Sequence, residues 1–501
     1  MIEWVNERSL QLKASMPLRL VRTYSSTAVI AVLAISGMAA SLLQTLLVPL
    51  LGELPGILDA SVDDVSWVIT ATLLASAVAT PTLTRLADMF GKKRMMLVCL
   101  GLLLVGSVIG AVSNTLTMVI VARIFQGAAS ALIPIGMSIM RDELPEEKLS
   151  GAVALMSATL GIGAAIGMPL SGIVYTFFGW HAIFWVSGIF AIVMFIAISI
   201  VVRESEIRTG GRFDYLGAFL LSGALTALLL GISKGGSWGW TSSQTLYTFG
   251  ICAAILAIWI PLEFRNERPL VDLRVSMRRP VLITNITSIL MGFAMYANML
   301  ATFQLLEMPT STGYGYGLTS LQAGLIMIPT CLTMVILAPV SARITRRYSA
   351  KITLILGAGL MGFGYIERLF YSDTVFLITV AAVIVSAGTA ISFAAMPLLI
   401  MGAVPETETS AANGLNTLLR SIGSSVSSAA ISGILAVLVV EIGGKNLPTQ
   451  QAFQMIFILG ALTSIIGALI AMAIPKPEHN ELGPIDPELI SELTQLHKEA
   501  K

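Results

Sequence analysis

Residues 181–202, HAIFWVSGIFAIVMFIAISIVV, form an apolar run that contains no Asp, Glu, Lys or Arg. At 1.5 Å per residue, a helix of this length crosses the roughly 30 Å of hydrocarbon in a lipid bilayer. A helix on the surface of a soluble protein would instead carry a polar face toward water. The stretch therefore predicts a transmembrane helix.

Similar stretches occur along nearly the whole chain, so this helix is one of many. About fourteen are predicted, which gives an all-α integral membrane protein. The other apolar runs of membrane-spanning length lie near residues 27–51, 65–84, 95–113, 116–139, 150–177, 214–233, 245–263, 281–306, 319–342, 351–370, 374–402, 410–440 and 452–474.

The composition agrees with a chain that is mostly surrounded by lipid. Of the 501 residues, 55% are hydrophobic and 12% are charged, whereas soluble domains carry about a quarter charged residues. The net charge of +1 gives no basic field for nucleic acid. The Cys and His residues have no metal-ligand spacing, and no nucleophile–base pair is evident, so we expect no metal, no cofactor and no enzymatic activity.

The placement of Lys and Arg predicts the orientation in the membrane. If the N-terminus is inside, the outer loops hold only Lys234, Arg368 and Lys445, and Arg123 and Arg420 lie within helices. All other basic residues then fall on the inner side, as the positive-inside rule requires. We therefore expect a multi-pass protein of the plasma (inner) membrane with both termini in the cytoplasm.

An internal repeat indicates two related halves. Residues 81–106 resemble residues 339–364, and residues 145–163 resemble residues 405–423 at nearly the same offset. The offset spans eight predicted helices, so two six-helix halves are separated by an inserted pair of helices. Repeats of this kind hold the substrate between them in secondary transporters.

This repeat predicts five segments. An amphipathic cytoplasmic arm (1–26) precedes the N-terminal half (27–202), and two inserted helices with their loops (203–280) lead to the C-terminal half (281–475) and a cytoplasmic tail (476–501).

Five short motifs stand at particular helix positions. Taken together, they resemble the motifs of the major facilitator superfamily, and in particular its fourteen-helix drug:proton antiporter branch. They are LADMFGKKR (86–94), RIFQG (123–127), GAAIGMPLSG (163–172), RFD (212–214) and ANGLN (412–416), the last followed by Arg420.

The first motif places charge at a helix end beside an inner loop. The carboxylate of Asp88 can meet a helix N-terminus, and Lys92, Lys93 and Arg94 are close to it in sequence. Such contacts across the seam between the halves would hold one conformation. The alternative is that these basic residues only fix the topology.

Two arginines inside helices are the next candidates for coupling. Arg123 lies roughly 10 Å below the outer surface, where an arginine usually faces a cavity or a partner. We expect Arg123, with Gln126 and Gly127, to act in coupling or to contact an anion, and Arg420 to have a related role. The alternative is a structural arginine bonded to backbone carbonyls.

The third motif, GAAIGMPLSG (163–172), resembles the antiporter motif of this family, and its Gly163, Gly167, Pro169 and Gly172 make a thin helix face. A face of this kind can bend during a conformational change. Close packing against a neighbouring helix explains the glycines equally well.

Polar and soft side chains at helical spacing predict a wet substrate cavity between the halves, near the first, fourth, ninth and twelfth helices. The 24 methionines suit a pliable site, although ordinary helix packing also explains any single Met or Phe. The candidates are Ser41, Gln44, Thr45, Asn285, Ser288, Met295, Asn298, Ser386, Thr389, Phe393, Met396 and Asn416.

The chain departs from the branch it resembles in its first helix. That branch carries an Asp in a Leu-Asp-x-Thr pattern, whereas Leu43 stands at this position here. A proton antiporter needs a group that loads and unloads a proton, usually a buried carboxylate. Glu307 is the first candidate for this group, and Asp88 or another site at the seam is the rival.

The resemblance implies a secondary transporter that works by alternating access. We expect a monomer, in contact with membrane lipid, that exports hydrophobic small molecules such as drugs, antibiotics or secondary metabolites, coupled to proton entry. Neutral or anionic substrates fit better than cations, because the two charges embedded within helices, Arg123 and Arg420, are positive. The alternatives are a carrier or binding protein for lipid or hydrophobic metabolites without proton coupling, and an uptake carrier.

Overall fold

The apolar runs form long helices in the computed structural model, which describes residues 25–47, 50, 53–210, 212–266, 269–370, 373–442 and 445–475. The predicted arm and tail lie largely outside these residues. Within them, 13 helices are long and apolar enough to cross a membrane. The helix α9, of 33 residues, adds a further helix of spanning length. The prediction of about fourteen membrane helices in an all-α protein is therefore confirmed.

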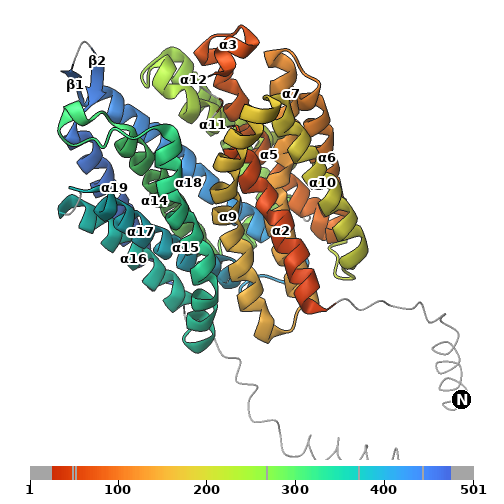
Figure 1. Ribbon diagram of the computed structural model, residues 1–501. Coiled ribbons are helices and arrows are strands. Elements are labelled where there is room, and N and C mark those ends of the chain that lie inside the picture. The colour runs from red at the N-terminus through yellow and green to blue at the C-terminus, as the bar shows by residue number, and fades with distance from the viewer. Residues whose placement is uncertain are drawn as a thin grey trace, which may run out of the picture.

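The first group of helices runs from α2 to α10 and is drawn from red to yellow in Figure 1. Its members are α2 (Ser26–Thr45), α3 (Leu54–Leu58), α4 (Val62–Val65), α5 (Trp67–Phe90), α6 (Lys92–Ala111), α7 (Leu116–Gly127), the 3-10 turn η2 (Ala128–Ala131), α8 (Leu132–Glu143), α9 (Glu146–Phe178) and α10 (His181–Val201).

The second group, drawn from green to blue, lies beside the first in Figure 1, and the inserted pair α11 and α12 connects the two in sequence. The helices α11 (Tyr215–Trp238) and α12 (Ser243–Arg265) are followed by α13 (Leu273–Ser276), α14 (Arg279–Glu307), η3 (Thr310–Thr312), α15 (Ser320–Arg347), α16 (Ala350–Phe370), α17 (Val375–Met401), η4 (Glu406–Glu408), α18 (Thr409–Val437), the antiparallel strands β1 (Val439–Ile442) and β2 (Lys445–Pro448), and α19 (Gln450–Met472).

Each group has its own apolar core. One cluster of buried side chains draws on α2, α5, α6, α8, α9 and α10, and another on α14, α16, α17, α18 and α19. Outward-facing Ile, Val, Leu and Phe side chains cover the rest of the helix surfaces, as expected for contact with lipid.

The two groups meet along a seam. The helix α9 packs against α15 and α17, and α5 packs against α18. Small side chains make the approach close, because Ala154 and Ala158 of α9 pack with Ala338 and Ala342 of α15. The inserted helix α11 packs against both α5 and α18, so it lies along this seam.

The first helix is shorter than predicted. The run 27–51 was expected to be one helix, but α2 ends at Thr45 and the short helices α3 and α4 follow. Pro55 lies in the first turn of α3, where a proline is tolerated because the N–H that it lacks would have no partner inside the helix, so a new helix can begin there.

Candidate functional site

The seam is closed at one end by a carboxylate of the first half. At the end of α5, Asp88 is fully buried, and its two oxygens accept hydrogen bonds from Ser410 N (3.2 Å) and Ala411 N (2.8 Å). Both donors lie in the first turn of α18, whose free N–H groups and dipole favour a negative charge. Asp88 therefore binds the N-terminus of a helix in the opposite half.

Further polar contacts reinforce this junction. Arg141 at the end of α8 donates to Thr409 Oγ1 (2.6 Å) and to the Val404 carbonyl (3.3 Å). Thr209, in the segment between α10 and α11, donates from its backbone N–H to the Asp88 carbonyl (2.7 Å) and from its hydroxyl to the Thr407 carbonyl (2.6 Å). Neither Arg141 nor Thr209 belongs to one of the five motifs, so neither was predicted to take part.

The basic residues after Asp88 contact their own half instead. Lys92, fully buried, forms an ion pair with Asp142 at 2.6 Å. The backbone N–H groups of Lys93 and Arg94 each donate to the Glu204 carboxylate at 3.1 Å. Between α5 and α6, Gly91 has a φ of +120°, and a Cβ on it would lie 2.6 Å from the Glu204 carboxylate. These contacts fix the turn that presents Asp88 to α18.

Arg123 lies inside the first half. It is 2% exposed, and its Nη1 donates to the Leu43 carbonyl (3.1 Å) and to Gln126 Oε1 (3.0 Å). Gln126 in turn donates to Ser107 Oγ (3.1 Å). These contacts join α2, α6 and α7, and they match the alternative of an arginine bonded to backbone carbonyls.

The glycines of the antiporter-like motif divide into two kinds. A Cβ on Gly163 would lie 2.8 Å from backbone atoms of Leu42 and Met38, and a Cβ on Gly167 would overlap Thr45 Oγ1. Gly172 has open space where its Cβ would be. Gly163 and Gly167 therefore permit the close contact of α9 with α2, and Gly172 does not take part.

The polar candidates of α2 lie in this same contact. Ser41 donates to the Leu160 carbonyl of α9. The Thr45 hydroxyl donates to the Gly163 carbonyl of the same helix, with an Oγ1–O distance of 3.4 Å. They hold α2 to α9 within the first half. The side chains of Gln44 and Pro169 lie outside the described residues.

Several candidates of the second half come together at one place. Asn416 of α18 donates to Asn285 Oδ1 (3.0 Å) and to Ser288 Oγ (2.5 Å), both on α14. Ser288 lies 3.0 Å from the sulfur of Met396 on α17. This buried polar cluster joins three helices of the half.

Arg420 lies one turn further along α18. Its guanidinium stacks over the Phe393 ring at 4.7 Å, and the residue is 7% exposed. Ion pairs within the described part of the chain occur at Lys92–Asp142 and Arg94–Glu204, so Arg420 has no acidic partner there. The Phe393 carbonyl accepts from Ser157 of α9 at 3.0 Å, which places this pair beside the seam.

Asn298 and Ser386 form a separate group with Arg368, whose predicted position was wrong. Arg368 was expected in an outer loop, but it lies within α16, is 1% exposed and donates to Asn298 Oδ1. Asn298 also donates to Ser386 Oγ at 3.3 Å. Arg368 stands near the end of the predicted helix 351–370, and for this reason it was expected in a loop.

Lys234 is a second basic residue inside a helix rather than in a loop. It lies within α11, is 6% exposed and donates to Ser66 Oγ at 2.6 Å. Its ammonium also lies 5.0 Å from the centre of the Trp67 ring. The expectation that Arg123 and Arg420 are the only basic residues embedded within helices is therefore wrong.

The remaining candidates make fewer contacts. Thr389 donates to the Val385 carbonyl of its own helix (3.0 Å), and Met295 is half-buried on α14. Glu307 is the last residue of α14 and is half-buried. Gly127 lies against α5, where its Cβ would be 2.7 Å from that of Ala75.

A cavity of about 110 Å³ lies on the seam where both halves meet the inserted helix α11. Hydroxyl groups of three helices line it, among them those of Thr70 on α5, Ser233 on α11, and Ser425 and Ser428 on α18. Thr70 Oγ1 and Ser233 Oγ are hydrogen-bonded at 3.1 Å. The cavity is a small space on the seam in which these hydroxyl groups lie among Leu, Ile and Trp side chains.

The sequence matches one protein family over most of its length. The profile described as Major Facilitator Superfamily matches residues 33–428 and 316–498. The chain belongs to the major facilitator superfamily. Members of this family are transporters, so the protein is a multi-pass membrane transporter and not an enzyme.

Named relatives share about a quarter of their residues with this major facilitator protein. The multidrug resistance protein Stp of Mycobacterium tuberculosis (strain CDC 1551 / Oshkosh) is 27% identical over 75% of this chain and 69% of its own length. The tetracenomycin C resistance and export protein of Streptomyces glaucescens is 26% identical over 79% of this chain and 72% of its own.

Solved structures agree with the fold. A human organic anion transporter, TETRAN, has a TM-score of 0.65 at 15% identity and covers 90% of this chain and 100% of its own. A proton:xylose symporter has a TM-score of 0.61 at 11% identity and covers 90% of this chain and 96% of its own. The core of two six-helix bundles is therefore that of major facilitator transporters.

Proposed function

We propose that this transporter exports hydrophobic small molecules, neutral or anionic, across the plasma membrane by alternating access coupled to proton entry. The observation that carries the proposal is the junction of Asp88 with Ser410 N and Ala411 N, which joins the two halves at one end of the seam. The functions in the names of the two relatives, multidrug resistance and tetracenomycin C resistance and export, support the direction and the substrate class.

In this mechanism the halves rock about the seam. With Asp88 ionised, its charge binds the N-terminus of α18 and keeps the seam shut at that end. Protonation removes the charge and with it most of the attraction to the helix dipole, so the end can open. Because protonation of Asp88 favours opening, a proton gradient can bias the cycle, and Glu307 remains a second candidate for the proton site.

The substrate would pass between the halves near Arg420. This guanidinium has an aromatic ring rather than a carboxylate as its partner. Asn416 on the same helix supplies further polar contacts together with Asn285 and Ser288 of α14. A buried cation of this kind attracts a neutral polar or an anionic group and repels a cation.

Transport in liposomes tests the proposal. The purified protein is reconstituted, a pH gradient is imposed, and movement of tetracenomycin C is followed as the probe. We expect uptake into inside-acid liposomes to exceed that without a gradient, because inverted molecules then exchange protons for the probe. We further expect Asp88→Asn to abolish the dependence on the gradient.

The matched control is Glu146→Gln, which changes an exposed carboxylate in the first turn of α9. It should leave gradient-driven transport intact. Transport that ignores the gradient in the unmodified protein, or that responds equally in Asp88→Asn, contradicts proton antiport.

A second candidate function is a carrier or binding protein for lipid or hydrophobic metabolites without proton coupling. The observation in its favour is Leu43, whose carbonyl accepts from Arg123 where the family resemblance implies an acid. An arginine satisfied by a carbonyl needs no titratable partner. Probe movement down its own gradient, unaffected by pH, would support this candidate over antiport.

A further inference from the structure

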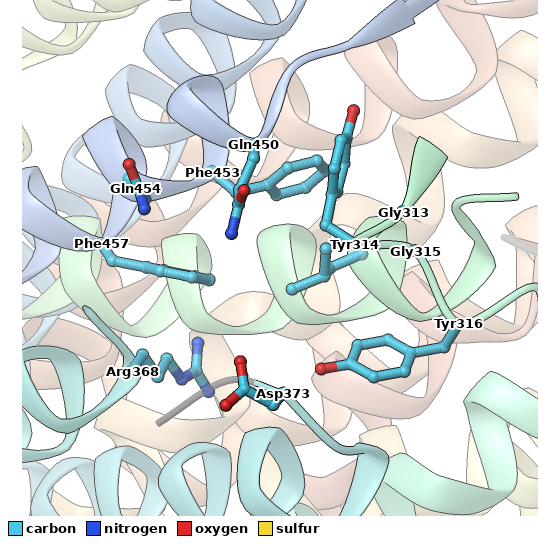
Figure 2. Close-up of a pocket in the computed structure, with 11 residues that line it drawn as sticks. Gly313, Tyr314, Gly315, Tyr316, Arg368, Asp373, Gln450, Phe453, Gln454 and Phe457 are labelled. Atoms are coloured by element: carbon cyan, nitrogen blue, oxygen red, sulfur yellow. The ribbon is translucent and has the colours of Figure 1, made fainter. Parts of the chain in front are cut away.

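A cavity of about 250 Å³ lies within the second half, away from the seam. Its walls come from the end of α14 and the loop after it, the end of α16, the segment between α16 and α17, and the start of α19, as Figure 2 shows. No residue of the first half lines it. It is therefore separate from the path proposed for the exported substrate.

A buried cation with free donors forms part of the wall. Arg368 is 1% exposed, and its Nη2 donates to Asn298 Oδ1. Its Nε and Nη1 are buried without a hydrogen-bond partner in the described part of the chain. The guanidinium lies 5.2 Å from the centre of the Phe457 ring. Buried N–H groups of a charged side chain are costly to leave unpaired, so this arrangement calls for an acceptor.

An acid lines the same cavity without pairing with that cation. The described ion pairs occur elsewhere, at Lys92–Asp142 and Arg94–Glu204, and Asp373 is an exposed residue of the cavity wall. Tyr316 lines the cavity as well, and burial together with the nearby Asp373 raises the pKa of its phenol. The cavity thus has a buried positive side and an exposed negative side.

Aromatic rings line the cavity beside these two charged groups, and Figure 2 shows no ring between the side chains of Arg368 and Asp373. Phe453 and Phe457 of α19 line the cavity together with Tyr314, whose hydroxyl donates to the Pro448 carbonyl. The volume is below the roughly 300 Å³ at which sites for drug-sized ligands begin, so it suits a smaller molecule.

We propose that this cavity binds a small apolar or aromatic zwitterion of the amino-acid type, with its carboxylate on Arg368 and its ammonium group toward Asp373. The carboxylate supplies acceptors for the free Nε and Nη1 donors. The ammonium group meets the exposed acid, and the apolar body lies against the rings of Phe453 and Phe457.

Such a ligand would also act on α17, which packs against α9 at the seam. Arg368 is bonded to Asn298 of α14, and Asn298 is bonded to Ser386 of α17. A ligand on Arg368 therefore stabilises the packing of α14, α16 and α17 against one another.

Calorimetric titration of the purified full-length protein tests this inference with three probes. L-phenylalanine carries both charges, 3-phenylpropionate lacks the amine, and 2-phenylethylamine lacks the carboxylate. We expect saturable binding of L-phenylalanine, with the two analogues weaker by roughly 10- to 100-fold.

Two variants assign the site. Arg368→Gln should abolish binding of L-phenylalanine and of 3-phenylpropionate, the two probes that carry a carboxylate. Asp373→Asn should weaken L-phenylalanine and leave 3-phenylpropionate unchanged, and because Asp373 is exposed, this variant keeps the test valid if Arg368→Gln does not fold. Arg420→Gln, at the seam, should leave all three affinities as they are.

Three results would overturn the inference. The first is the absence of saturable L-phenylalanine binding, which would mean that water alone satisfies Arg368. The second is loss of binding in Arg420→Gln but not in Arg368→Gln, which would put the ligand at the seam. The third is an unchanged affinity for L-phenylalanine in Asp373→Asn.

Discussion

The two halves use buried arginines in different ways. Arg123 in the first half donates to the Leu43 carbonyl and to Gln126, all within its own bundle. Arg368 in the second half retains buried donors without a partner, and Arg420 has an aromatic ring in place of an acceptor. Arg123 therefore holds helices of the first half together, whereas we propose that Arg368 and Arg420 of the second half also bind ligands.

The sharpest way to break this comparison is to replace Arg123 and Arg368 each with Met, which keeps an unbranched apolar stem and removes the charge and the donors. Arg123→Met leaves carbonyl and amide groups unpaired, so we expect a loss of roughly 3 kcal/mol of stability. Arg368→Met removes one donor bonded to Asn298 and two donors without a partner in the described part of the chain, so we expect a smaller loss of roughly 1 kcal/mol. Thermal unfolding in detergent measures both, and equal losses would refute the distinction.

A smaller effect is expected at the contact of α2 with α9, which keeps the first half rigid. Gly163→Ala places a Cβ 2.8 Å from backbone atoms that cannot move independently, and we expect about 2 kcal/mol of destabilisation. Gly172→Ala is the matched control, since nothing lies within 4 Å of its Cβ position. If the two variants have the same melting temperature, these glycines serve bending rather than packing.

The smallest effect concerns the choice of substrate. Arg420→Gln removes the charge beside Phe393 but keeps a polar side chain of similar reach. We expect about a tenfold fall in transport of an anionic substrate, with little change for a neutral one, because one charge-assisted hydrogen bond is lost. Arg420→Lys should restore most of the rate for the anion. Equal losses for both substrates would mean that Arg420 acts only in packing.

Most of the fold could be predicted from the sequence, because each membrane helix needs a long apolar run and each inner loop needs basic residues. The sequence could also predict that Asp88 stands at a helix end. Helical spacing correctly groups Asn285 and Ser288 on one side of α14, where Asn416 meets them.

Helical spacing shows which residues share a face, but it does not show which helix that face packs against. Ser41 and Thr45 do share a face, but that face packs on α9. Arg368 stands near a helix end, where basic residues commonly fix topology, so its burial against Asn298 depends on tertiary packing alone. Arg141 meets Thr409 through the approach of two halves that are far apart in sequence.

Alternating access about the seam is the central claim, and a distance across its closed end tests it most directly. Spin labels are placed at Lys148 of α9 and Arg347 of α15, both exposed, in a background without the native cysteines. We expect a short distance in the unmodified protein, and a second, longer one when Asp88→Asn removes the charge held by α18. A distance distribution that is identical in the two proteins, with and without substrate, would contradict the account.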